Sequence, residues 1–107
     1  MNAARVSMAD LPRDVDLALV LSRARPTGPT TDELRRRLRE YIGLLADPAE
    51  NYGRSLADSR QQDIVLDTVR HARAVAADLD QDPAVGLRLL AKSASYLARY
   101  AAGQRQT

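Results

Sequence analysis

The apolar residues of this chain recur three and four positions apart, the spacing that gathers side chains on one face of an α-helix. The clearest stripe consists of Leu34, Leu38, Tyr41, Leu45, Ala49, Tyr52 and Leu56. A later stripe consists of Ile64, Val65, Thr68, Val69, Ala72, Val75, Ala76 and Leu79. Because every long stretch of the sequence follows this period, the sequence predicts an all-α fold built from amphipathic helices.

The last helical stretch, from Pro83 to Ala102, is apolar around more than half of its circumference. Its first apolar arc consists of Leu87, Leu90, Ala94, Leu97 and Ala101. A second arc beside it consists of Leu89, Tyr96 and Tyr100. A helix in a small bundle usually buries only one such arc against its neighbours. Either this helix is central in the monomer and covered from both sides, or the second arc is a self-complementary patch for a homodimer.

The N-terminal part of the chain predicts a short additional helix. Pro12 suits the first turn of a helix that ends near Arg23. The following segment, 25–29, contains two prolines and one glycine and predicts a hinge. The short helix therefore docks on its own bundle or swaps between chains. Its side chains available to cover the last helix are Val15, Leu19 and Val20.

The long stripe continues in phase past Pro48. We therefore predict one helix kinked at this proline, although the lost hydrogen bond and the ring clash cost about 3 kcal/mol in a helix interior. The alternative is a break at Asp47 that divides the stripe between two helices. Capping-box pairs, which mark helix starts, occur at Thr30 with Glu33 and at Ser59 with Gln62.

Asp82 and Pro83 suit the N-cap and first position of the final helix, and Gly103 is placed to end it. We predict a three-helix antiparallel bundle over residues 30–102 with the short N-terminal helix as a fourth. The remaining parts are a flexible N-terminus at 1–10, the short helix and hinge at 11–29, and a polar tail at 103–107.

Composition narrows the function classes. The 107 residues suit one domain, and the chain has no cysteine, which excludes disulfides, thiol catalysis and cysteine-based zinc sites. No apolar run approaches the roughly 20 residues that span a bilayer, so we expect no membrane segment and a cytoplasmic protein. The formal net charge of +2 is nearly balanced, and Lys92 is the only lysine among 16 basic residues. Arginine count alone therefore does not predict nucleic-acid binding.

One acidic face carries the only histidine. By helical spacing, Asp63, Asp67, His71 and Asp78 share an arc, which suits proton transfer or a metal site. The simpler interpretation is a solvated face on which Asp67 pairs with His71 or Arg70. No Glu-x-x-His pair occurs, so a di-iron centre is not supported. We expect no catalytic residue, no metal and no cofactor, and an enzyme is the less favoured class.

A basic stripe follows the last helix, and no acidic residue comes after Asp82. The stripe consists of Arg88, Lys92, Ser95 and Arg99. It suits a solvated face or an acidic protein partner. Nucleic acid is disfavoured because the stripe offers neither side chains for base edges nor aromatic rings for stacking.

Two hypotheses about function follow. The first is a non-enzymatic interaction or regulatory module, a homo-oligomer or bound to another protein, whose partner-binding residues are Leu89, Tyr96, Tyr100, Arg88, Lys92 and Arg99. The second is a small-molecule binder or minor enzyme with a pocket between helices of at least about 300 Å³. Its candidate lining residues are Tyr41, Tyr52, Tyr96 and His71.

Two blocks carry a resemblance to known proteins: LRRRLREYIGLLADPAE, and DTVRHARAVAADLDQDPAVGLRLLAKSASYLARYA. With the proline-interrupted long helix, they resemble a family of small, uncharacterised actinobacterial helical proteins labelled as natural-product biosynthesis proteins. The resemblance covers roughly Asp32 to Ala101. It implies an association with secondary metabolism, and it implies no activity and no functional residue.

Overall fold

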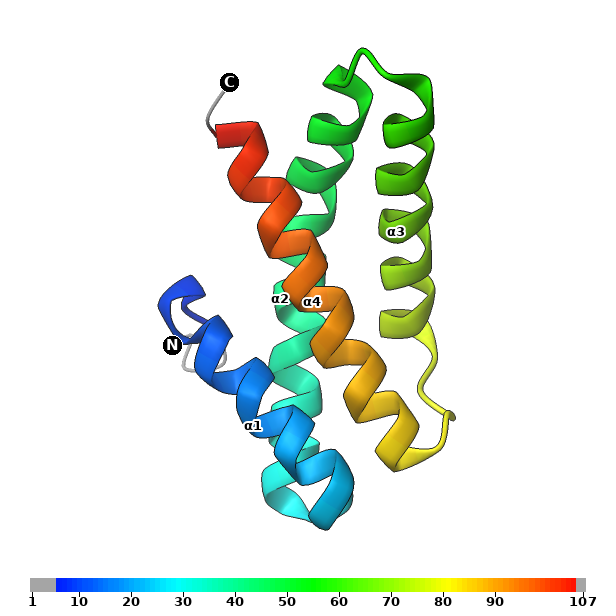
Figure 1. The fold of residues 1–107 in the computed structure, drawn as a ribbon. Helices are drawn as coiled ribbons and strands as arrows, with labels where there is room; N and C mark the ends of the chain where they lie inside the picture. Colours follow the sequence, from blue (N-terminus) through cyan, green and yellow to red (C-terminus); the bar gives the residue numbers. More distant parts are fainter. Residues whose placement is uncertain (1–5, 106–107) are drawn as a thin grey trace.

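A computed structural model describes residues 6–105, and the side chains of residues 6–103. The order of elements is a short 3-10 helix η1 (Met8–Asp10), then α1 (Leu11–Ala24), α2 (Pro29–Ser55), α3 (Ser59–Ala77) and α4 (Pro83–Arg105). No strand occurs within the described residues. The predicted all-α fold with four α-helices is confirmed (Figure 1).

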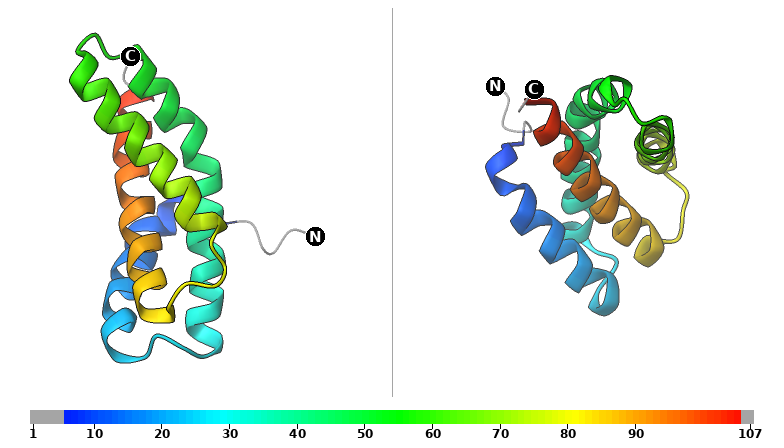
Figure 2. Two further views of the ribbon diagram at one scale, coloured as in Figure 1. Left: turned by 90° about the vertical axis from the view of Figure 1, so that its right-hand side faces the viewer. Right: turned by 45° about the horizontal axis from the view of Figure 1, so that its top comes forward.

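The four α-helices alternate in direction along the chain, as Figure 1 shows. The helices α2 and α4 run the same way and make the most extensive contact in the molecule. The helix α3 packs against this pair from one side and α1 from the other (Figure 2). The structure thus has the predicted three-helix core with the N-terminal helix added as a fourth.

The central position of α4 explains why it carries two apolar arcs. It packs against α1, α2 and α3. The members of its first arc are almost fully buried: Leu87, Leu90, Ala94, Leu97 and Ala101. In the second arc, Leu89 and Tyr100 are partly buried against the core, whereas Tyr96 is 46% exposed. Of the two interpretations of this helix, central burial in the monomer accounts for most of its apolar surface.

The helix α2 continues through Pro48. The predicted single helix is therefore confirmed, and the alternative of a break at Asp47 is wrong. The stripe holds because its members on both sides of the proline, Leu45 and Ala49 among them, are buried in one core. Burial on both sides offsets the hydrogen bond that the proline ring removes.

Two predicted helix starts are displaced. The N-cap of α2 is Gly28, not Thr30, and Thr31 Oγ1 donates a hydrogen bond to the Gly28 carbonyl. The N-cap of α3 is Asp58, whose carboxylate accepts from Gln61 N at 3.0 Å, so the capping box at Ser59 is wrong by one residue. Aspartate caps as well as serine does, and here it is the residue with extended backbone angles.

The ends of α4 agree in part with prediction. Asp82 caps its start, because the carboxylate accepts from Val85 N at 3.1 Å and Pro83 is the first helical residue. The predicted stop at Gly103 is wrong, since the helix extends to Arg105. Gly103 has another reason to lack a side chain: a Cβ there would lie 2.6 Å from Cε1 of Tyr52.

The N-terminal region packs more closely than expected. Residues 1–5 of the expected flexible start, and residues 106–107 of the polar tail, lie outside the described residues. Val6 is buried, and its amide donates to Glu40 Oε2 at 3.0 Å. In α1, Val15 is buried and Leu19 partly buried, but Val20 is 62% exposed, so Val20 does not cover α4. Its place in the packed face is taken by Leu11 and Ala18.

Within residues 6–105, no helix combines the length and the hydropathy that crossing a bilayer requires.

Candidate functional site

Five of the candidate residues meet in a groove between α3 and α4: Asp67, His71, Leu89, Lys92 and Tyr96. Arg88, Arg99 and Tyr100 are not among its lining residues. The volume of the groove is about 300 Å³, and its lining residues are Asp67, Thr68, His71, Leu89, Lys92, Ser93 and Tyr96. We refer to this feature as the α3–α4 groove. The two helices that form it run in opposite directions (Figure 1).

The floor of the α3–α4 groove is apolar. Leu89 is partly buried against the core, and Tyr96 stands half-exposed beside it. On α3, Ile64 lies one turn before Thr68, outside the lining of the groove, and is 53% exposed, although the apolar stripe predicts it to be buried. Large apolar side chains exposed close together mark surfaces that bind other molecules. This floor can therefore accept an aliphatic or aromatic side chain.

Lys92 lines the α4 side of the groove, and Arg99 lies next to it against Tyr96. The guanidinium carbon of Arg99 lies 5.8 Å from the centre of the Tyr96 ring, within cation–π range. Lys92 and Arg99 are exposed and Arg88 is partly exposed. Among the described residues, none of these three has an acidic side chain within ion-pair distance, so their charges are available to a bound anion or carboxylate.

Two of the three aspartates of the α3 arc have partners within the described chain. Asp67 pairs with Arg70, with 2.6 Å between Oδ1 and Nη1. Asp78 accepts from the amide of Asp80 at 3.0 Å. The described part of the chain contains no group of three or more histidine, cysteine, aspartate or glutamate side chains placed to hold a metal ion. The four residues of the arc are all exposed, and Asp67 pairs with Arg70 rather than with His71.

The structure separates the tyrosines proposed to line one pocket. Tyr52 stacks on Tyr100, with ring centres 6.0 Å apart and an angle of 14° between the planes. This pair connects α2 to α4 and lies outside the lining of the α3–α4 groove. Tyr100 is therefore not part of the same exposed surface as Tyr96. Of the candidate pocket residues, only His71 and Tyr96 come together.

Tyr41 is fully buried and has a structural partner in α1. Its hydroxyl donates to Asp14 Oδ2, and Arg37 Nε donates to the same oxygen at 2.8 Å. Burial, followed by the hydrogen bond to Asp14, raises the pKa of Tyr41 from 10.0 to about 12. Asp14 is itself 4% exposed, so this cluster ties α1 to α2 through a buried, paired charge. Tyr41 therefore cannot line a ligand pocket.

Helical spacing alone could have found two further groove residues. Ser93 lies four positions after Leu89 and is buried, and Thr68 lies three positions before His71. Both side chains are small and uncharged, so the sequence alone does not mark them as binding residues. Comparison with protein-family models, with curated proteins and with solved structures finds no match for this chain.

Proposed function

We propose that this protein is a non-enzymatic helical interaction module that binds an acidic, amphipathic segment of another protein in the α3–α4 groove. The observation that carries the proposal is the combination of an apolar floor with cations that have no acidic partner within the described chain. An amphipathic helix laid into such a groove buries apolar side chains against Leu89 and Tyr96. Its carboxylates would meet Lys92 and Arg99.

Charge favours a different protein over a second copy of this chain. A two-fold symmetric contact places the same patch on both sides of the interface. A dimer whose two-fold axis passes beside the α4 cations would place those of one copy against those of the other, and like charges brought together oppose association. An acidic partner instead gains complementary potentials, which also raise the association rate. The resemblance to actinobacterial natural-product proteins leads us to place the partner among the cytoplasmic proteins of such a pathway.

A designed peptide tests the proposal. The probe is a helical peptide with leucine on one face and glutamate on the other, labelled for fluorescence anisotropy, and its control carries lysine in place of glutamate. We expect saturable binding of the acidic peptide only, weakened by added salt. The Leu89→Glu, Tyr96→Glu double variant should abolish binding, while Val20→Glu, on the exposed face of α1, should not.

The outcomes separate the candidate partners. Circular dichroism of the double variant must first match the parent, so that lost binding is not misfolding. Equal binding of both peptides, or binding unaffected by the double variant, would refute the groove as an acidic-segment site. A parent protein that forms a dimer in light scattering, and a monomer in the double variant, would replace the acidic partner by a second copy.

A second candidate function is small-molecule binding in the same groove. It is favoured by the volume of about 300 Å³, at the lower end of ligand pockets, and by the imidazole of His71 beside the ring of Tyr96. Phenol, titrated while the NMR signals of His71 are observed, tests it. Saturable shifts at His71 together with no binding of the acidic peptide would favour this function over the first.

A further inference from the structure

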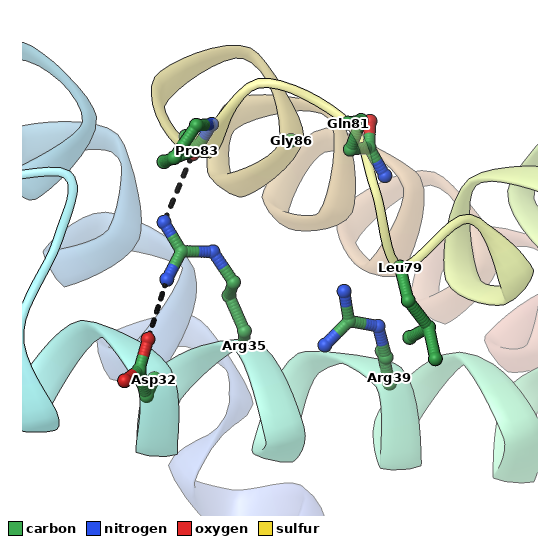
Figure 3. A pocket seen from close by; sticks show the side chains of 7 residues that line it. All are labelled: Asp32, Arg35, Arg39, Leu79, Gln81, Pro83 and Gly86. Atoms are coloured by element: carbon green, nitrogen blue, oxygen red, sulfur yellow. Dashed lines mark hydrogen bonds and ion pairs between the residues drawn. The ribbon is translucent and has the colours of Figure 1, made fainter.

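A second pocket lies beside the N-terminal half of α2. The start of α4 and the α3–α4 connection form its other walls. Its volume is about 370 Å³, and it is lined by Asp32, Arg35, Arg39, Leu79, Gln81, Pro83 and Gly86 (Figure 3). It shares no lining residue with the α3–α4 groove. The pocket combines two arginine side chains, one turn apart on α2, with an apolar wall.

Arg39 is the unusual residue in this pocket. Its Nε is buried and has no hydrogen-bond partner. Among the described residues, no carboxylate or carbonyl pairs with its guanidinium, which Figure 3 shows standing off α2 toward the space between Arg35, Gln81 and Leu79. A buried donor without an acceptor costs about 1–3 kcal/mol, and more when it is charged. The folded protein therefore holds a cation whose Nε is buried without an acceptor.

Arg35 adds a second positive charge that is fixed in place. It donates to the carbonyls of Pro26 and Pro83 and pairs with Asp32 at 3.0 Å. These bonds attach the α1–α2 hinge and the start of α4 to α2. Burial, followed by the charge of Arg35, lowers the pKa of Arg39 below its ordinary value. Like charges four residues apart oppose helix stability, and a bound anion would relieve this repulsion.

The remaining walls are preformed. Gln81 donates its side-chain amide to the carbonyls of Val75 and Asp78, so it caps the end of α3 and is held still. Gln81 can pack this closely on α4 because residue 86 is glycine. A Cβ at Gly86 would lie 2.7 Å from Gln81 Cγ. Leu79 is 73% exposed at the pocket edge, which leaves an isobutyl group unburied beside two cations. A rigid cationic pocket with an apolar edge suits a small ligand that has both characters.

We infer that the pocket formed by Arg35, Arg39, Gln81 and Leu79 binds a small molecule that carries an oxyanion, either carboxylate or phosphate, with an apolar part. The planar fork of Arg39 presents paired donors to two oxygens of the anion, which is the geometry that guanidinium groups use for both oxyanions. Arg35 supplies long-range attraction while keeping its backbone bonds. The apolar part of the ligand rests on Leu79 and Pro83. This site is independent of the proposed partner groove.

NMR of the arginine Nε–Hε groups tests the inference directly. The probes are sodium benzoate, which joins a carboxylate to an apolar ring, and sodium phosphate, each titrated against sodium chloride at equal ionic strength. We expect a saturable shift of the Arg39 Nε–Hε signal with benzoate, with phosphate, or with both, and none with chloride. The two arms then report which oxyanion the site prefers.

Two variants make the result specific. Arg39→Met keeps an unbranched side chain and should weaken probe binding by about tenfold or more. Arg60→Met removes one exposed arginine at the start of α3, far along the chain from the pocket, and should leave binding unchanged. In chloride alone, Arg39→Met should melt at the same temperature as the parent or higher, because it removes a repulsive charge and an unpaired donor.

Three results would overturn the site. The first is a shift that rises linearly with every salt, which reports ionic strength alone. The second is probe binding that Arg39→Met leaves intact. The third is an Arg39→Met variant that is folded but melts well below the parent in chloride, because Arg39 would then be a structural residue whose partners are satisfied without a ligand.

Discussion

The four tyrosines of this chain occupy three different environments, and each environment sets a different role. Tyr41 is buried and donates to Asp14, Tyr52 and Tyr100 stack on each other, and Tyr96 is half-exposed in the α3–α4 groove. The Tyr41 hydroxyl and Arg37 both donate to Oδ2 of Asp14, and without the hydroxyl this buried oxygen would accept from Arg37 alone. The Tyr41 hydroxyl thus adds one buried hydrogen bond to a carboxylate that Arg37 already pairs with.

Replacing Tyr41 by phenylalanine removes that hydroxyl and keeps the ring. We expect Tyr41→Phe to lower the free energy of unfolding by about 2 kcal/mol at neutral pH, because a carboxylate loses one buried hydrogen bond. Urea denaturation measures the effect. Tyr96→Phe is the matched control, because its hydroxyl is on an exposed side chain, and it should change stability by less than about 0.5 kcal/mol.

The same residue predicts a pH dependence. The pKa of Tyr41 rises from 10.0 to about 12 on folding, so the neutral phenol is favoured in the folded state. This contribution is complete below about pH 10 and is lost as the pH increases toward about 12. The stability advantage of the parent over Tyr41→Phe should therefore shrink across that window. Parallel stability curves for the two proteins would contradict the assigned pKa.

The sequence predicts that Tyr41 lies on the apolar face of α2, and it does not predict its partner. Asp14 is 27 positions away in α1, and helical periodicity says nothing about which side chains meet across two helices. The groove shows the same limit. Leu89, Lys92 and Tyr96 are near one another by spacing within α4, whereas their approach to His71 depends on how α3 packs.

At the scale of elements, helix interiors were more predictable than helix ends. The stripe of α2 rests on many residues at one period, so a single proline, Pro48, does not interrupt it. An N-cap depends on the backbone angles of one residue. Aspartate and serine are about equally favoured there, so Asp58 and Ser59 are both good candidates. The sequence could place the start of α3 within one residue but could not choose between them.

A pair of alanine variants decides between these caps. Asp58→Ala should lower the free energy of unfolding by about 1 kcal/mol, since its carboxylate accepts from the Gln61 amide. Ser59→Ala should be nearly neutral, because Ser59 is the first helical residue and is exposed. Thermal unfolding of both variants is the measurement. A larger loss for Ser59→Ala would restore the predicted capping box.

Glycines inside the helices give a second comparison between elements. A Cβ at Gly43 meets nothing within 4 Å, whereas a Cβ at Gly103 would press on the ring of Tyr52. Alanine favours a helix interior by about 0.5–1 kcal/mol over glycine. Gly43→Ala should therefore stabilise the protein by up to that amount, and Gly103→Ala should destabilise it. Equal gains at both positions, measured by urea denaturation, would show that the contact of α4 with Tyr52 yields without cost.

At the scale of the whole molecule, α1 decides how much apolar surface the bundle exposes. It packs against α4 on the side opposite α3 and also against α2, and its buried apolar residues are Leu11, Val15 and Ala18. The hinge before α2 makes this return possible, because Gly28 has φ of 117°, a backbone conformation suited to glycine. Without α1, part of the apolar surface of α4 loses its cover.

A chain that begins at Pro26 tests this role. We expect the full chain to be monomeric in light scattering at several concentrations, and the shortened chain to self-associate and to unfold at a lower temperature, because an uncovered apolar face of α4 favours association. The full chain with Val20→Glu serves as the control, since Val20 lies on the outer face of α1. A shortened chain that stays monomeric and equally stable would show that α2 and α3 alone enclose α4, and that α1 is an appendage free to act elsewhere.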